Sequence, residues 1–163
     1  AVLNPSELAV ASVELLNKYD SPIWAIEDND WGAVTIQVAQ TLHYRRLYYY
    51  AEGKCGWHTF DTGGLAHPEN SRYVIWGDLI EAVNRRALTI PNGQGLAQFF
   101  TVIRNPEKRG RIEAQQGAHD DYPMALAIAW QIRSQARPAA GDRGREGQPD
   151  GILRRVRQGW SRW

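Results

Sequence analysis

The segment Ile23–Asp30 reads Ile-Trp-Ala-Ile-Glu-Asp-Asn-Asp, and it decides the fold class. Its first half is an uninterrupted apolar run whose length suits one buried strand. The run follows a turn-rich stretch at residues 19–22 and switches abruptly to acidic and amide side chains at Glu27. Open α/β sheets bind their ligands at the carboxyl ends of such strands. The segment therefore predicts a buried strand that presents Glu27 at a candidate site.

Helical patterns alternate with apolar runs around this strand. A helix is expected from Pro5, because Asn4 can cap its start and Glu7 stands at the capping-box position. A second helix is expected over 33–42, and a second strand over 46–50. This alternation is typical of an α/β sheet flanked by helices. The apolar face of the first helix is marked by Leu8, Ala11 and Leu15.

The second half of the chain continues the alternation. After a loop over 51–71, we expect a helix over 74–87 and a short strand over 88–90. A strand over 111–114 is expected to pair back on 88–90. The helix between these strands has helical spacing along an apolar face that we expect to be buried. That face consists of Leu96, Phe99, Phe100 and Ile103.

Composition bounds the class of protein. The chain has 163 residues, of which 43% are hydrophobic and 23% charged, as expected for one globular domain. It has no apolar run of the roughly 20 residues that a membrane span requires. Cys55 is the only cysteine, which excludes an internal disulfide and fits a reducing compartment.

Charge divides the chain into two parts. Residues 137–163 contain seven Arg and three acidic residues, which leaves 12 basic and 15 acidic residues in 1–136. We interpret 1–136 as a mildly acidic folded domain. We interpret 137–163 as a flexible basic tail, because its composition shifts to Gly, Arg, Asp and Pro.

Two acidic positions are candidates for chemistry. Glu27 ends the buried strand, and Asp120 and Asp121 begin a last helix whose first turn also contains Pro123. Carboxylates from a strand end and a helix start can converge on Mg²⁺, which prefers oxygen ligands. Acidic residues at these positions also serve commonly as turn formers and helix caps. On spacing alone, the structural roles are the more frequent explanation.

Four motifs in a fixed order add a family resemblance. They are Ile26–Asn29 with Gly32, Gly56–Thr59 with Arg72, Leu88–Pro91 before an apolar helix, and Gly117–Asp121 with Ala125–Ala127. Together they resemble the nuclease domain of tailed-bacteriophage large terminases, which has an RNase H-like fold. They resemble, in turn, its second acidic motif, its Gly-Trp-x-Thr loop with a later basic residue, its inserted β-hairpin region and its third acidic motif. The resemblance covers about residues 5–135.

The resemblance implies a role for individual residues. The catalytic and metal-binding residues would be Glu27, Asp121 and Asp120, holding two Mg²⁺ or Mn²⁺ ions. His119 and Asn29 would support them. The candidate contacts to DNA phosphates are Arg72 and Lys54. The expected reaction is hydrolysis of concatemeric double-stranded DNA during genome packaging.

The resemblance also implies partners and a location. We expect double-stranded DNA, the portal protein, the small terminase and an upstream ATPase domain as partners, no membrane, and the bacterial host cytoplasm as the location. Family members carry a first catalytic Asp on strands that precede the helix expected at 5–17. Nothing here matches that Asp. We therefore expect a fragment, or strands supplied by another polypeptide, and weak or no cleavage by this chain alone.

Two other functions are compatible with the sequence. An RNase H-like resolvase or transposase would share the acidic motifs, although the inserted hairpin argues against it. A noncatalytic interaction module of the packaging motor would use the basic, aromatic end at 152–163 to dock on the portal or on DNA.

Overall fold

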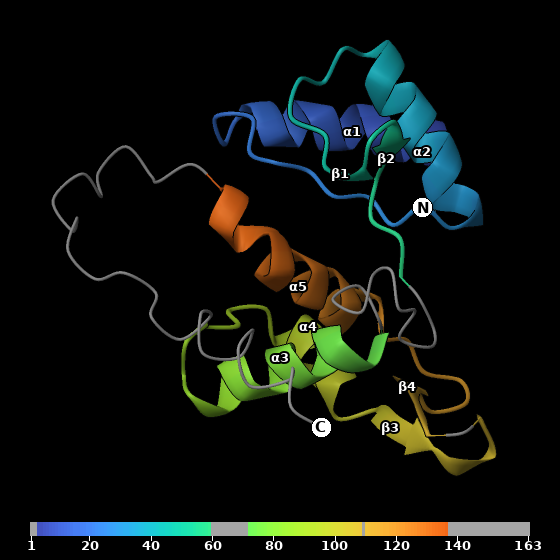
Figure 1. The fold of residues 1–163 in the computed structure, drawn as a ribbon, viewed down its shortest axis with the longest axis vertical. Coiled ribbons are helices and arrows are strands. Elements are labelled where there is room, and N and C mark those ends of the chain that lie inside the picture. The colour runs from blue at the N-terminus through green and yellow to red at the C-terminus, as the bar shows by residue number, and fades with distance from the viewer. Residues whose placement is uncertain (1–2, 60–71, 109, 137–163) are drawn as a thin grey trace, which may run out of the picture.

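The structure is a computed structural model that describes residues 3–59, 72–108 and 110–136 (Figure 1). Within these residues it has a mixed α/β arrangement, as predicted. The helices are α1 (Pro5–Asn17), α2 (Asp30–Thr41), α3 (Arg72–Asn84), α4 (Gly93–Phe99) and α5 (Asp121–Ile132). Two antiparallel hairpins are formed by β1 (Tyr49–Ala51) with β2 (Lys54–Cys55), and by β3 (Val102–Asn105) with β4 (Arg111–Ala114). Short 3₁₀ turns are η2 (Pro106–Lys108) and η3 (Arg133–Gln135).

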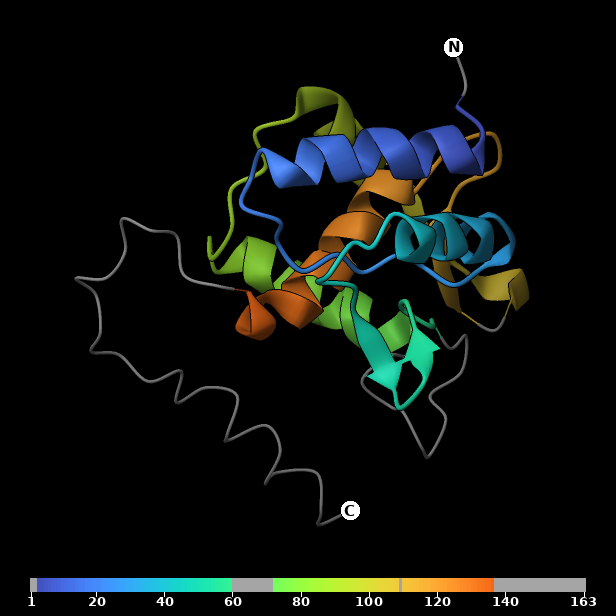
Figure 2. The same ribbon diagram turned by 90° about the horizontal axis from the view of Figure 1, so that it is seen from above.

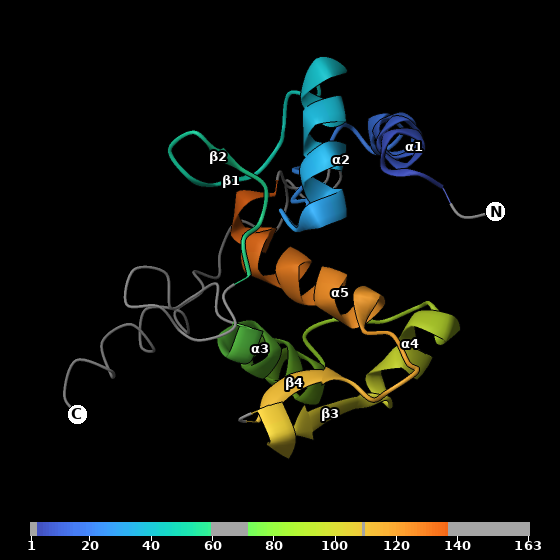
Figure 3. The same cartoon turned by 90° about the vertical axis from the view of Figure 1, so that its right-hand side faces the viewer.

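The helix α5 lies between two groups of elements. On one side are α1 and α2, and on the other are α3, α4 and the hairpin β3–β4 (Figures 1 and 3). The hairpin β1–β2 extends away from α1 (Figures 2 and 3). None of the described helices is long and apolar enough to cross a membrane. The predicted tail at 137–163 lies outside the described residues.

The start of α1 confirms the predicted capping box. The Asn4 side chain accepts a hydrogen bond from the Glu7 N–H at 2.9 Å, and the Glu7 carboxylate accepts one from the Asn4 N–H at 3.0 Å. The face marked by Leu8, Ala11 and Leu15 is exposed, and the buried residue of this helix is Ala9. The helix packs on α2 through its other side. Helical spacing of apolar residues identifies a face of the helix, but it does not show which element covers that face.

The predicted strand at 23–27 is an extended segment with parallel pairing. One isolated bridge joins Trp24 to Leu47, and another joins Glu27 to Trp57. The segment is therefore central to the arrangement although its pairing is too interrupted to form a continuous ladder. The second predicted strand, at 46–50, appears as the bridge at Leu47 followed by β1.

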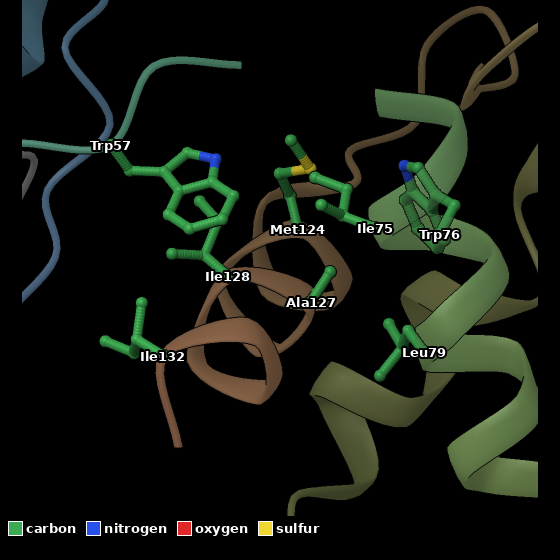
Figure 4. Packing of buried hydrophobic residues seen from close by; sticks show 8 residues of the cluster. All are labelled: Trp57, Ile75, Trp76, Leu79, Met124, Ala127, Ile128 and Ile132. Carbon is green, nitrogen blue, oxygen red and sulfur yellow. The ribbon is translucent and has the colours of Figure 1, made fainter. Parts of the chain in front are cut away.

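Alternate side chains of this segment belong to two hydrophobic clusters. Trp24 and Ile26 pack with the α2 residues Ile36 and Ala39. On the other face, Ile23 and Ala25 pack against the larger cluster, which α3 and α5 dominate. Figure 4 shows that cluster, with Trp57 beside α5 and the α3 residues facing it. Its members are Trp57, Ile75, Trp76, Leu79, Met124, Ala127, Ile128 and Ile132. The extended segment thus has helices on both faces, as a buried parallel strand requires.

The predictions for residues 88–103 need correction. No strand forms at 88–90, and β4 pairs with β3 in the register Val102–Ala114 to Asn105–Arg111. The helix ends at Phe99, which leaves Phe100 82% exposed and Ile103 on a strand. Val102 and Ile103 are β-branched, and such residues fit a pleated strand better than a helix. The loop predicted at 51–71 begins later, because β1 and β2 occupy 49–55.

Truncating the α3 side of the larger cluster is expected to destabilise the protein. Leu79 is fully buried, so Leu79→Ala removes packed methyl groups and should lower the free energy of unfolding by about 2–5 kcal/mol. Its neighbour Ile80 is 50% exposed, and Ile80→Ala should change the same quantity by no more than about 0.5 kcal/mol. Urea denaturation of both variants measures the difference. Equal losses would contradict the assignment of the core.

Candidate functional site

A cavity of about 760 Å³ contains the predicted acidic residues in its lining. Its walls come from the segment 23–29, from β4 and from one face of α5. Glu27, Asp120 and Asp121 all line it, although 93 residues separate Glu27 from Asp120 in the sequence. The lining also includes Asn29 and Arg72, whereas His119 and Lys54 are not among the lining residues. The fold therefore brings the end of the segment 23–27 and the start of α5 to the same cavity.

Glu27 is oriented by the turn that starts α2. The Asn29 side chain donates a hydrogen bond to Glu27 Oε2 at 3.2 Å, and its carbonyl oxygen accepts one from the Gly32 N–H at 3.2 Å. Asn29 is thus the N-cap of α2 and a contact of Glu27 at the same time. A Cβ atom at Gly32 would lie 1.7 Å from the Glu27 carbonyl oxygen, so only glycine permits this turn. Asn29 thus contacts Glu27 directly, and its predicted supporting role in catalysis stays a prediction.

Arg72 ties three elements together. Its guanidinium donates to the Asp120 carboxylate and to the Ile112 carbonyl oxygen, and one of its nitrogens lies 3.9 Å from Met124 Sδ. The Arg72 and Asp120 side chains are only 12% and 22% exposed. Arg72 therefore joins the start of α3 to β4 and to the residue that precedes α5. Its predicted contact with DNA would require this pair to open or to share the guanidinium, and it stays a prediction.

Asp121 differs from its neighbour in its surroundings. Its side chain is 87% exposed, and His119 Nδ1 lies 3.7 Å from Asp121 Oδ2. The backbone there is held in place, since the Tyr122 N–H donates to Gln98 Oε1 at 2.9 Å. Asp121 is thus an accessible carboxylate on an anchored helix start, whereas Asp120 is engaged by Arg72.

The sequence interpretation missed a fourth carboxylate in the cavity wall, Glu113. Lys108 and Asn105 donate hydrogen bonds to it at 3.0 and 2.8 Å, and these bonds lower the pKa of Glu113 below its ordinary value. Its charge is balanced within the hairpin β3–β4. Alternation along β4 could have signalled its position, but the partners depend on the hairpin register.

The acidic run after the strand is also divided between two environments. Asp28 Oδ1 lies 2.8 Å from His58 Nδ1, from which it accepts a hydrogen bond when that nitrogen carries a proton, and the His58 ring lies 5.7 Å from the ring of Tyr50. Lys54 lies on β2 with an exposed side chain, away from the cavity lining. Glu27 and Asn29 therefore line the cavity, where Asn29 is also the N-cap of α2, whereas Asp28 pairs with a histidine outside the lining.

The carboxylate oxygens in the cavity lining are of the donor type that a hard divalent cation binds. Within the described ranges, neither Glu27 nor Asp121 forms an ion pair with a Lys or Arg side chain. Carboxylate oxygens are the ligands that Mg²⁺ and Mn²⁺ prefer. In the part of the chain that the structure describes, no three His, Cys, Asp or Glu side chains are grouped closely enough to hold a metal ion.

Comparison with known proteins adds no family assignment: no protein-family model, curated protein or solved structure matches the chain.

The Arg72–Asp120 pair is expected to couple the elements around the cavity. In a double-mutant cycle with Arg72→Met and Asp120→Asn, the coupling energy should exceed about 1 kcal/mol, because both side chains are largely buried. The exposed pair Arg85–Glu81 on α3 is the matched control, and its coupling should stay below about 0.5 kcal/mol. Unfolding free energies of the single and double variants provide both values. A coupling no larger than that of the control pair would show that Arg72 does not hold Asp120 in solution.

Proposed function

We propose that this chain is the nuclease part of a bacteriophage large terminase, which hydrolyses double-stranded DNA during genome packaging. One observation carries the proposal beyond the ordered motifs: Glu27 and Asp121, which match the second and third acidic motifs, line the same cavity. The proposal includes an RNase H-like fold, in which the segment 23–27 is one strand of a larger sheet. The portal protein, the small terminase and an ATPase domain belong to the proposal as partners.

The chain's own residues have distinct tasks in this reaction. Glu27 and Asp121 would hold Mg²⁺ or Mn²⁺, with Asn29 fixing the orientation of the Glu27 carboxylate. Bound divalent ions activate water and stabilise the leaving oxygen in phosphodiester hydrolysis. Asp120 contributes chiefly through Arg72, which sets the position of the helix start. His119 would support Asp121, since its Nδ1 lies 3.7 Å from the Asp121 carboxylate.

Metal binding tests the proposed site without requiring cleavage. Glu27→Gln and Asp121→Asn should each weaken Mn²⁺ binding at least roughly tenfold, because each removes one anionic oxygen ligand. Glu14→Gln, on the exposed part of α1, is the matched control and should leave the affinity unchanged. Electron paramagnetic resonance of free Mn²⁺ during titration gives the affinities. An unchanged affinity in both cavity variants would contradict the assignment of the site.

Cleavage by the isolated chain is expected to be weak or absent. The family pattern requires a further catalytic Asp, and we match no residue of this chain to it. Plasmid nicking in the presence of Mn²⁺, followed by agarose electrophoresis, is the measurement. Robust nicking by these 163 residues that disappears in Glu27→Gln would support the nuclease and contradict the need for another carboxylate.

A further inference from the structure

The first turn of α5 contains a backbone N–H that the helix itself cannot satisfy. The first hydrogen bond within α5 runs from the Met124 N–H to the Asp120 carbonyl at 2.9 Å, so earlier N–H groups need partners outside the helix. A capping side chain ordinarily accepts from the second or third helical residue. The third is Pro123, which has no N–H, so a cap of this kind can act only on Tyr122.

A side chain from another helix caps α5 at this amide. Gln98, near the end of α4, accepts a hydrogen bond from the Tyr122 N–H through its Oε1 at 2.9 Å. Asp120 stands at the usual capping position, but its side chain makes no capping bond and accepts from the Arg72 guanidinium instead. Gln98 thus caps α5 from outside, which leaves Asp120 to join the helix start to α3.

The ring of Tyr122 packs against the same short helix. Asn92 caps α4, since its side chain accepts from the Gly95 N–H at 3.0 Å. A Cβ atom at Gly95 would lie 2.5 Å from the Tyr122 ring, so α4 approaches the start of α5 as closely as glycine permits. Figure 3 shows α4 beside that end of α5. Tyr122 is therefore held by α4 at both its amide and its ring.

These contacts act on the residue that precedes Tyr122. The amide that Gln98 holds belongs to a planar peptide group that begins at the Cα atom of Asp121. Gln98 therefore fixes the backbone from which the Asp121 carboxylate projects. The Asp121 side chain is 87% exposed, so its backbone is the part of this residue that the fold can position. On the strand side of the cavity, Asn29 contacts the Glu27 carboxylate itself.

We propose that Gln98 is a positioning residue of the metal site, because it sets the place of the Asp121 carboxylate relative to Glu27. The inference rests on the proposed function, in which Glu27 and Asp121 share a divalent ion. Mg²⁺ requires near-ideal geometry at about 2.1 Å from its oxygen ligands, so a displaced carboxylate binds it less tightly. The helix α4 thus influences metal binding although none of its residues lines the cavity.

Metal affinity and amide exchange test the inference on the full chain. Gln98→Leu removes the acceptor oxygen, so it should expose the Tyr122 amide to exchange and weaken Mn²⁺ binding at least roughly threefold. Gln98→Glu keeps an acceptor at the same place, and it should restore both the protection of this amide and the affinity. Electron paramagnetic resonance of free Mn²⁺ gives the affinity, and NMR without metal gives the exchange rate.

Thr101→Val is the matched control. The Thr101 hydroxyl donates to the Gln98 carbonyl at 2.8 Å, so this variant also removes one hydrogen bond from the end of α4. It leaves the bond between the Gln98 side chain and Tyr122 in place. Its unfolding midpoint should fall by about as much as that of Gln98→Leu, whereas its Mn²⁺ affinity should not change. A purely structural role of Gln98 would weaken binding equally in both variants.

A second variant reaches the same backbone through the ring of Tyr122. Gly95→Ala forces this ring to shift, so it should also weaken Mn²⁺ binding although Gln98 is unchanged. Affinities of Gln98→Leu and Gly95→Ala that equal that of the unaltered chain, or an equal loss in Thr101→Val, would overturn the inference alone. The absence of Mn²⁺ binding by the unaltered chain would contradict the proposed function, and the role of Gln98 with it.

Discussion

The parallel pairing of the segment around Trp24 and Glu27 is the interaction on which the rest of the structure depends. Its hydrogen bonds to residues 46–48 and to Trp57 hold an apolar run extended. Side chains then alternate between two clusters, which places α2 on one face and α5 on the other. The last bridge of this pairing is at Glu27, which lines the same cavity as α5.

Local signals were sufficient for several elements. Asn4 and Glu7 predict the start of α1, because a capping box satisfies backbone donors within four residues. The run before Glu27 predicts an extended segment, and Pro123 limits where α5 can begin. The sequence did not show which elements pack or pair with one another. Periodicity cannot say whether Leu8 is covered, and β-branched residues such as Val102 fit either a helical face or a hairpin until their partner strand is known.

In the candidate site too, the positions of acidic residues could be predicted, whereas their side-chain contacts could not. Strand-end and helix-start positions led to Glu27 and Asp121, which line one cavity. The sequence did not reveal that Arg72 engages Asp120, because this pair spans 48 residues and exists only when α3, β4 and α5 are in place. It also did not reveal that the hairpin β3–β4 balances the charge of Glu113. Side-chain partners at long sequence separation depend on tertiary placement, which local patterns do not encode.

The proposed nuclease requires that the two accessible carboxylates share a divalent ion. Arg72 and Asn29 have the geometry of supporting groups, since each fixes one side of the cavity by a hydrogen bond to an acidic residue. A crystal of the protein soaked in Mn²⁺ and measured at the manganese absorption edge tests this most directly. If the two carboxylates share an ion, anomalous density should appear between Glu27 and Asp121, within coordination distance of both. A well-ordered cavity that has no manganese, or carboxylates too far apart to share an ion, would contradict it.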